Sequence, residues 1–237
     1  NQIRAMYDYQ NKEGMIADCI YRDTSIEAHN WRDTKPPLSA WAIWEVFEET
    51  RDTAFLHELY PKLVRYHRWW YKYRDYDKDG LCEYGSTDGS LIAAKWESGM
   101  DNAIRFDNCK IVEGSSFSMN TESVDLNSYL AKEKEYLSKM AKVLKRPEHK
   151  KWNKESITLS DRIRKDFYDE KTGYFFDIDA ESGQFLNDAL GPEGWTPVWC
   201  EIATIEQAAK VVSHMLDTNK FNTKIPLPTI DVSHPAF

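Results

Sequence analysis

Apolar residues recur at helical spacing along much of the chain, and this pattern predicts a protein built from paired helices. One helix is predicted to open at Leu38, directly after Lys35-Pro36-Pro37, because proline is tolerated in a first helical turn. A second should begin at Thr53, where Asp52 offers an N-cap. Because only a few residues join these two helices, we expect an antiparallel helical hairpin.

The second half of the chain continues this pattern. A third helix is predicted from a cap at Asn120 to about 144, a fourth spans about 148–167, and a fifth runs from about 198 to 216. Between them, residues 174–178 indicate a strand, and Gly183 marks the turn of a small β-hairpin. We therefore predict an all-α fold in which helical hairpins form a ring, an α/α toroid, with the long polar and aromatic loops gathered at the functional end.

Composition narrows the class of partner. The 237 residues suffice for one domain, and a net charge of −8 argues against nucleic acid or an anionic membrane surface as the partner. No apolar run approaches the length of a membrane span. The chain begins at Asn1 without Met and ends at Phe237 without a polar tail, so both ends are expected to be cuts through a longer chain. Its 9 Trp, 13 Tyr and 10 Phe suit sugar binding, although much of this aromatic content must be core.

The segment Asp75-Tyr76-Asp77-Lys78-Asp79-Gly80-Leu81 matches the first half of an EF-hand loop. Oxygens at its first, third and fifth positions would converge on one cation, glycine permits the sharp turn, and the Leu81 carbonyl adds a ligand. The match then fails, because the twelfth position is Ser86 instead of Glu. Calcium binding therefore needs a carboxylate from elsewhere, for which Glu83 and Glu122 are candidates; the alternative is a plain surface turn.

The segment Trp96-Glu97-Ser98-Gly99-Met100-Asp101 is the strongest candidate for catalysis. Hydrolysis of a glycosidic bond needs one carboxyl group to protonate the leaving oxygen and another to activate water or attack carbon. A carboxyl beside Trp and Met is partly desolvated, which would raise its pKa and keep it protonated. Gly99 would let the backbone approach a ligand closely. The alternative is structural, with Glu97 capping a helix and Asp101 turning a loop.

A third polar cluster comprises His29-Asn30-Trp31-Arg32 and Lys35. These side chains could bind sugar hydroxyls, or they could simply decorate a loop. The adjacent Trp69 and Trp70 lie at helical spacing and are assigned to the core.

Together these motifs resemble glycoside hydrolase family 63, and especially its bacterial α-glucosidase branch; processing glucosidase I and the mannosylglycerate hydrolases are more distant relatives. The motifs that carry the resemblance occur in family order: Lys35-Pro36-Pro37 with Trp41, the Asp75–Gly80 loop followed by Glu83-Tyr84-Gly85, Trp96-Glu97-Ser98-Gly99-Met100-Asp101-Asn102, Glu122-Ser123-Val124-Asp125-Leu126 and Gly191-Pro192-Glu193-Gly194-Trp195.

The resemblance implies a partial (α/α)6-barrel catalytic domain over residues 1–237 and an inverting mechanism on an oligosaccharide substrate. Asp101 is expected to be the general acid. Trp96, Glu97 and Gly99 are expected to form walls of the glucose subsite. Further substrate contacts are assigned to Trp31, Arg32, Lys35 and Trp195. A structural Ca²⁺ is expected on Asp75, Asp77, Asp79, the Leu81 carbonyl and Glu122.

One departure affects the predicted activity. The family's general base is a Glu near a Glu-Asn-Tyr motif, and that motif is absent here. The chain alone is therefore expected to lack the base, leaving three hypotheses. The first is an inverting α-glucosidase acting on gluco-oligosaccharides. The second is a hydrolase for a charged glycoside such as mannosylglycerate, with Arg32, Lys35 and Arg105 as possible carboxylate donors. The third is a non-catalytic carbohydrate-binding protein.

Overall fold

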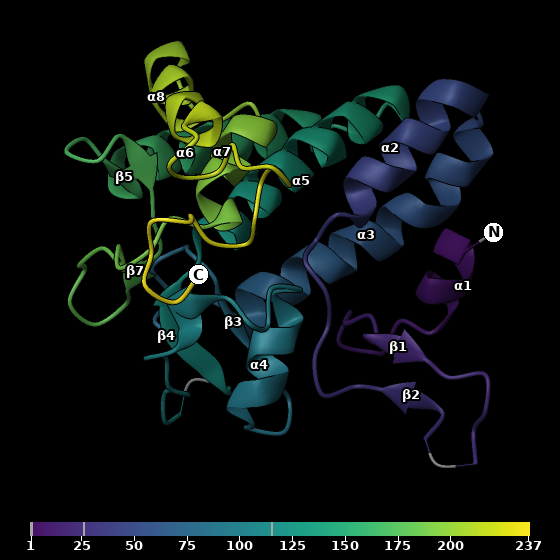
Figure 1. The fold of residues 1–237 in the computed structure, drawn as a ribbon. Coiled ribbons are helices and arrows are strands. Elements are labelled where there is room, and N and C mark those ends of the chain that lie inside the picture. Colours follow the sequence, from purple (N-terminus) through teal and green to yellow (C-terminus); the bar gives the residue numbers. More distant parts are fainter. Residues whose placement is uncertain (1, 26, 115) are drawn as a thin grey trace.

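Helices dominate the computed structural model, which describes residues 2–25, 27–114 and 116–237 (Figure 1). The α-helices are α1 (Gln2–Asp8), α2 (Ser39–Thr50), α3 (Thr53–Tyr73), α4 (Leu91–Glu97), α5 (Val124–Val143), α6 (His149–Asp166), α7 (Thr196–Trp199) and α8 (Ile205–Leu216). Two short 3-10 helices, η1 (Ile104–Phe106) and η2 (Pro192–Trp195), lie in the loops. The helical class predicted from the sequence is therefore confirmed.

Helices α2 and α3 form the predicted hairpin. The Asp52 side chain accepts hydrogen bonds from the backbone N–H groups of Ala54 and Phe55, at 2.9 and 3.1 Å, and so caps α3 as expected. Arg51, the only other linking residue, adopts a left-handed conformation (φ 55°) that ends α2. Trp69 and Trp70 of α3 are 3% and 0% exposed, which confirms their place in the core.

Helix α5 is the most buried of the helices. Fifteen of its 20 residues are buried, and it contacts α2, α3, α6 and α7. A helix enclosed on most sides also buries polar groups, among them Lys132, Glu133 and Lys134. Helix α6 covers one side of α5 with Trp152, Leu159 and Ile163.

The strands are more extensive than the single predicted hairpin. β3 (Glu83–Gly85), β4 (Ser118–Glu122) and β7 (Ile178–Asp179) form an antiparallel sheet in the order β3-β4-β7. Two two-stranded sheets pair β1 (Cys19–Ile20) with β2 (His29–Asn30), and β5 (Tyr168–Asp169) with β6 (Tyr174–Phe175). The sheet β3-β4-β7 and α4 gather at one end of the long helices, below them in Figure 1.

Two helix boundaries differ from the prediction. Asn120 does not cap the third helix; it lies in β4, its amide bonds Asp179 at 3.0 Å, and α5 begins after Ser123. The predicted fifth helix is two helices, because Glu201 takes a left-handed conformation (φ 58°) after α7 and Thr204 opens α8 with a capping box to Gln207. Within the described ranges, no helix is both long enough and apolar enough to cross a bilayer.

Candidate functional site

Asp101 projects from a tight turn at the end of α4. The helix runs from Leu91 to Glu97, and Gly99 follows it with φ +69°, the left-handed conformation that commonly ends helices. A Cβ on Gly99 would meet nothing within 4 Å, so conformation, and not crowding, requires glycine here. The Met100 N–H donates to the Ser98 hydroxyl at 2.9 Å and tightens the turn. Asp101 itself is exposed, so the partial desolvation expected of a carboxyl beside Trp96 and Met100 does not hold for Asp101.

The base of this turn is fixed by a buried ion pair. Arg74, directly after α3, donates from Nε and Nη2 to the two carboxylate oxygens of Glu97, at 2.7 and 2.8 Å. The Arg74 and Glu97 side chains are 1% and 0% exposed. The Gly85 N–H donates to the same carboxylate at 2.7 Å, and the Thr34 N–H at 3.4 Å. Burial raises the pKa of Glu97, and the Arg74 guanidinium opposes that shift.

Glu97 is therefore engaged with protein groups on both oxygens, and its geometry is that of a positioning carboxylate. Its predicted contact with substrate stays a prediction. Sequence reasoning missed Arg74, because nothing in the local pattern shows that this arginine turns inward to a partner 23 positions away.

The His29–Lys35 segment lies against Trp96, as a shared site would require. The Arg32 guanidinium carbon is 5.8 Å from the centre of the Trp96 ring, and its only ion pair in the described ranges is a long one, 3.9 Å, to Glu27. Lys35 donates to the Trp96 carbonyl oxygen at 2.7 Å and pairs with Asp18 and Asp33 at 2.9 and 3.0 Å. Lys35 thus ties the end of α4 to the N-terminal loops.

Trp31 is half-buried in the same segment, and its carbonyl oxygen accepts from the Thr87 hydroxyl at 2.6 Å. Trp195, by contrast, lines a separate aromatic groove of about 540 Å³ with Trp41, Tyr129 and Trp199. No residue of the Trp96–Asp101 segment lines that groove. Six of the seven predicted substrate-binding residues thus cluster with Asp101 through contacts or direct chain continuity, whereas Trp195 belongs to another surface.

Arg105 is buried among acidic groups. Its guanidinium donates to Asp125 at 2.9 Å from both Nη atoms and to Asp177 at 3.0 Å, and all three side chains are at most 4% exposed. Burial raises the pKa of Asp177 to about 6 and that of the nearby Glu193 to about 7, and Arg105 opposes both shifts. A guanidinium already paired with two carboxylates is poorly suited to bind the carboxylate of a substrate.

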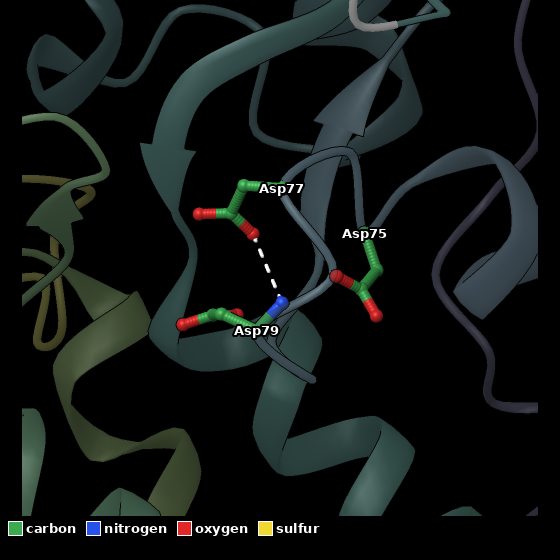
Figure 2. Close-up of side chains that lie close together, drawn as sticks. All are labelled: Asp75, Asp77 and Asp79. Atoms are coloured by element: carbon green, nitrogen blue, oxygen red, sulfur yellow. Dashed lines mark hydrogen bonds between the residues drawn. The ribbon is translucent and has the colours of Figure 1, made fainter.

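The predicted cation loop brings its three aspartates together (Figure 2). One carboxylate oxygen from each of Asp75, Asp77 and Asp79 lies within 4.8 Å of the others. The loop is closed by backbone N–H donors, from Asp79 to Asp77 at 3.2 Å and from Leu81 to Asp79 at 2.8 Å. Gly80 has φ +92°, consistent with the sharp turn that the motif requires.

Glu83 and Glu122 complete the acidic cluster. They face each other across the β3–β4 pair, and an oxygen of each lies within 4.8 Å of an oxygen of Asp77. Glu83 is 0% and Glu122 4% exposed, and Oε1 of Glu83 and Oε2 of Glu122 have no hydrogen-bond partner among the described residues. Burial raises the pKa of Glu122 to about 8 and that of Glu83 well above its ordinary value, and the neighbouring carboxylates add to both shifts.

Two buried carboxylates with orphaned oxygens, beside three aspartates, fit a hard divalent cation such as Ca²⁺, which binds several carboxylate oxygens. The fit includes Glu83 in addition to the predicted Glu122. Arg162 of α6 also binds the loop, because it donates hydrogen bonds to the Asp79 carboxylate at 2.5 Å and to the Asp79 carbonyl oxygen at 2.6 Å.

Arg74 and strand β3 connect the cation cluster to the Asp101 turn. Arg74 immediately precedes Asp75, and its carbonyl oxygen accepts from the Glu83 N–H at 2.7 Å. The same three-residue strand carries Glu83 of the cluster at one end and Gly85, bonded to Glu97, at the other.

Comparisons with known proteins identify the family and the fold of this chain. Residues 1–237 match the family profile described as the mannosylglycerate hydrolase MGH1-like glycoside hydrolase domain. The chain is 25% identical over 236 residues to an uncharacterized protein of Borreliella burgdorferi, covering 99% of this chain and 42% of that protein. It is 28% identical over 126 residues to a mannosylglycerate hydrolase of Thermus thermophilus, covering 45% of this chain and 28% of that enzyme.

The solved structure of a GH63 mannosylglycerate hydrolase from Thermus thermophilus, in complex with Tris, superposes with a TM-score of 0.79 at 19% identity. The match covers 99% of this chain and 69% of that structure, and this likeness shows a shared fold. The matched segments cover less than half the length of the curated relatives given above.

Proposed function

Because the chain belongs to the MGH1-like glycoside hydrolase domain family, within glycoside hydrolase family 63, we propose that it carries the general acid and part of the sugar subsite of an inverting glycosidase. Its helical hairpins would form part of an (α/α)6 barrel, with the α4 turn at the loop end. The buried Arg74–Glu97 pair carries the proposal, because it holds the base of a turn from which the exposed Asp101 projects.

In the proposed reaction, Asp101 donates its proton to the glycosidic oxygen as the bond to the anomeric carbon breaks. A general base from the full-length protein activates water on the opposite face of the sugar, and the configuration inverts. Trp96 and Trp31 offer rings for the apolar face of the sugar. The backbone at Gly99 is open to a ligand, because a Cβ there would meet nothing within 4 Å.

We further propose that Asp75, Asp77, Asp79, the Leu81 carbonyl, Glu83 and Glu122 hold a structural Ca²⁺. When bound, the ion supplies positive charge that offsets the repulsion among these carboxylates. These residues would connect the ion to the Asp101 turn. Glu83 and Gly85 lie on one strand, and Arg74 forms hydrogen bonds with both that strand and Glu97.

The basic side chains near the site bear on the choice between two classes of substrate. Our first proposal is α-linked gluco-oligosaccharides, and it is supported by the pairing of the basic side chains that a charged substrate would need: Arg105 with Asp125 and Asp177, and Lys35 with Asp18 and Asp33. The second is mannosylglycerate, which the names of the relatives favour. Arg32 is the basic group beside Trp96 that would then bind the glycerate carboxylate.

The test is turnover by the full-length protein on kojibiose, nigerose, maltose, isomaltose and mannosylglycerate, with ¹H NMR of the first anomer released. Hydrolysis of an α-glucoside with initial release of the β-anomer supports the first proposal. Exclusive hydrolysis of mannosylglycerate supports the second. Sugar binding without turnover of any glycoside would instead support a carbohydrate-binding protein, and retention of configuration would contradict the inverting mechanism.

A further inference from the structure

A groove of about 720 Å³ lies between α3 and α6, and Lys134 of α5 also lines it. Basic side chains from all three helices line it: Arg68 of α3, Lys134 of α5, and Lys151, Lys154 and Arg162 of α6. The chain as a whole has a net charge of −8, whereas the side chains that line this groove are mainly positively charged. Asp79 and Gly80 of the proposed calcium loop border the groove, but neither the proposed reaction nor the proposed calcium site uses its basic side chains as ligands.

Lys134 is the unusual member of this groove, because it is 7% exposed. Its ammonium donates to the Tyr71 hydroxyl and lies 4.0 Å from the centre of the Tyr71 ring. Across the described ranges, no carboxylate lies within ion-pair distance of its Nζ. Burial lowers the pKa of Lys134 to about 8, which reflects the cost of holding a cation there without a counter-ion.

His67 adds a second polar group without its full set of partners. Its Nδ1 lies 2.5 Å from Oε2 of Glu133, while its Nε2 is buried with no partner among the described residues. Burial lowers the pKa of His67 and raises that of Glu133.

The acidic side chains that line the groove already have cationic partners. Asp79 is held by Arg162 at 2.5 Å, and Glu155 lies 3.7 Å from Lys151. Arg68, Lys134 and Lys154 remain without an ion pair within the part of the chain that the structure describes. Three cations without a carboxylate partner exceed what one carboxylate can satisfy, whereas a phosphate group offers three acceptor oxygens and up to two negative charges.

We propose that this groove binds a small ligand that carries a phosphate group. Lys134 and Tyr71 contact the phosphate oxygens, and Arg68 and Lys154 attract the anion from the rim. This site is independent of the glycosidase reaction, because none of its proposed contacts touches the Trp96–Asp101 segment.

The experiment titrates inorganic phosphate and glucose 6-phosphate into the full-length protein at constant ionic strength and micromolar calcium. Binding is measured by calorimetry and by the shift in Tm, with glucose as the uncharged control. We expect saturable binding with Kd at or below about 1 mM. Lys134→Met should weaken it at least about tenfold, which corresponds to about 1.4 kcal/mol. Lys139→Met is the matched control, because Lys139 lies on the same helix but pairs with Glu135 at the surface, and it should bind as wild type does.

Absence of saturable binding would overturn the proposal, as would unchanged affinity in a folded Lys134→Met variant. If Lys134→Met does not fold, the exposed double variant Arg68→Gln/Lys154→Gln decides: a loss of tenfold or more supports the site, and unchanged affinity refutes it. Co-sedimentation with phosphatidylserine vesicles, without binding of either free phosphate, would assign the basic face to a membrane and contradict the small-molecule site.

Discussion

Arg74 and Glu97 form a bidentate ion pair from which solvent is excluded, with N–O distances of 2.7 and 2.8 Å. Arg74 stands between α3 and the cation loop, and Glu97 ends the helix that precedes Asp101. The pair therefore connects two sequence motifs that are separated along the chain, and it accounts for how a loop residue such as Asp101 is held in place.

Removal of one partner should destabilise the protein strongly. Arg74→Met leaves the Glu97 carboxylate buried and unpaired, for which we expect a loss of roughly 3–5 kcal/mol in the free energy of unfolding by urea denaturation. Arg51→Met is the matched control, since Arg51 makes the same kind of pair with Glu48 at the surface, and its cost should stay below about 1 kcal/mol. Similar small losses in both variants would show that the buried pair does not hold the turn.

Gly99 should matter to catalysis beyond its effect on stability. Gly99→Ala places a Cβ in open space but at φ +69°, so we expect a cost of about 1–2 kcal/mol from backbone strain. Gly114 is the control, because it has φ +77° and equally open surroundings. Both alanine variants should lose similar stability, and only Gly99→Ala should raise KM. Equal KM values in the two variants would remove Gly99 from the subsite.

Calcium should stabilise the protein through the paired glutamates. Chelation should lower the Tm measured by calorimetry, and added calcium should restore it. Glu122→Gln removes one of two facing buried carboxylates, so in chelator it should be at least as stable as wild type, yet it should gain little from calcium. Glu170→Gln, an exposed change, should keep the full calcium response. A full response in Glu122→Gln would exclude Glu122 as a ligand.

Glu193 should make the protein less stable as the pH rises. Its pKa is about 7 in the folded chain, against an ordinary value of 4.5, so between these pH values the unfolded chain releases the proton that the folded chain retains. Stability should fall across this window by on the order of 3 kcal/mol from this group. In Glu193→Gln that part of the decline should disappear, as measured by urea unfolding at pH 4.5 to 8. The same pH slope in both proteins would contradict the assignment.

The helices and the acidic loop were predictable because their signals are local. Asp52 caps the helix that follows it, and Asp75, Asp77 and Asp79 lie two residues apart on one turn. The start of α5 was not predictable in the same way. Asn120 could equally well cap a helix in isolation, and the partner that places it in β4 instead, Asp179, lies 59 positions away.

Buried charge was the least predictable feature. Arg74, Arg105 and Lys134 are ordinary surface residues by type, and only the tertiary fold encloses them. Arg105 was predicted as a possible carboxylate donor for this reason, and the structure pairs it with Asp125 and Asp177 instead. Trp195 had a plausible aromatic role, but its place in a separate groove depends on the packing of α7 and α8.

The central claim is that Asp101 is the general acid, and leaving-group dependence tests it most directly. In the full-length protein, kcat/KM of Asp101→Asn should fall by roughly 10²–10⁴-fold on the natural glycoside. It should fall far less on the matching dinitrophenyl glycoside, whose leaving group needs no proton. Because Asp101 is exposed, the Tm should not change, and Asp107→Asn, an exposed neighbour, should behave as wild type. An equal loss on both substrates, or no loss on either, would contradict the account.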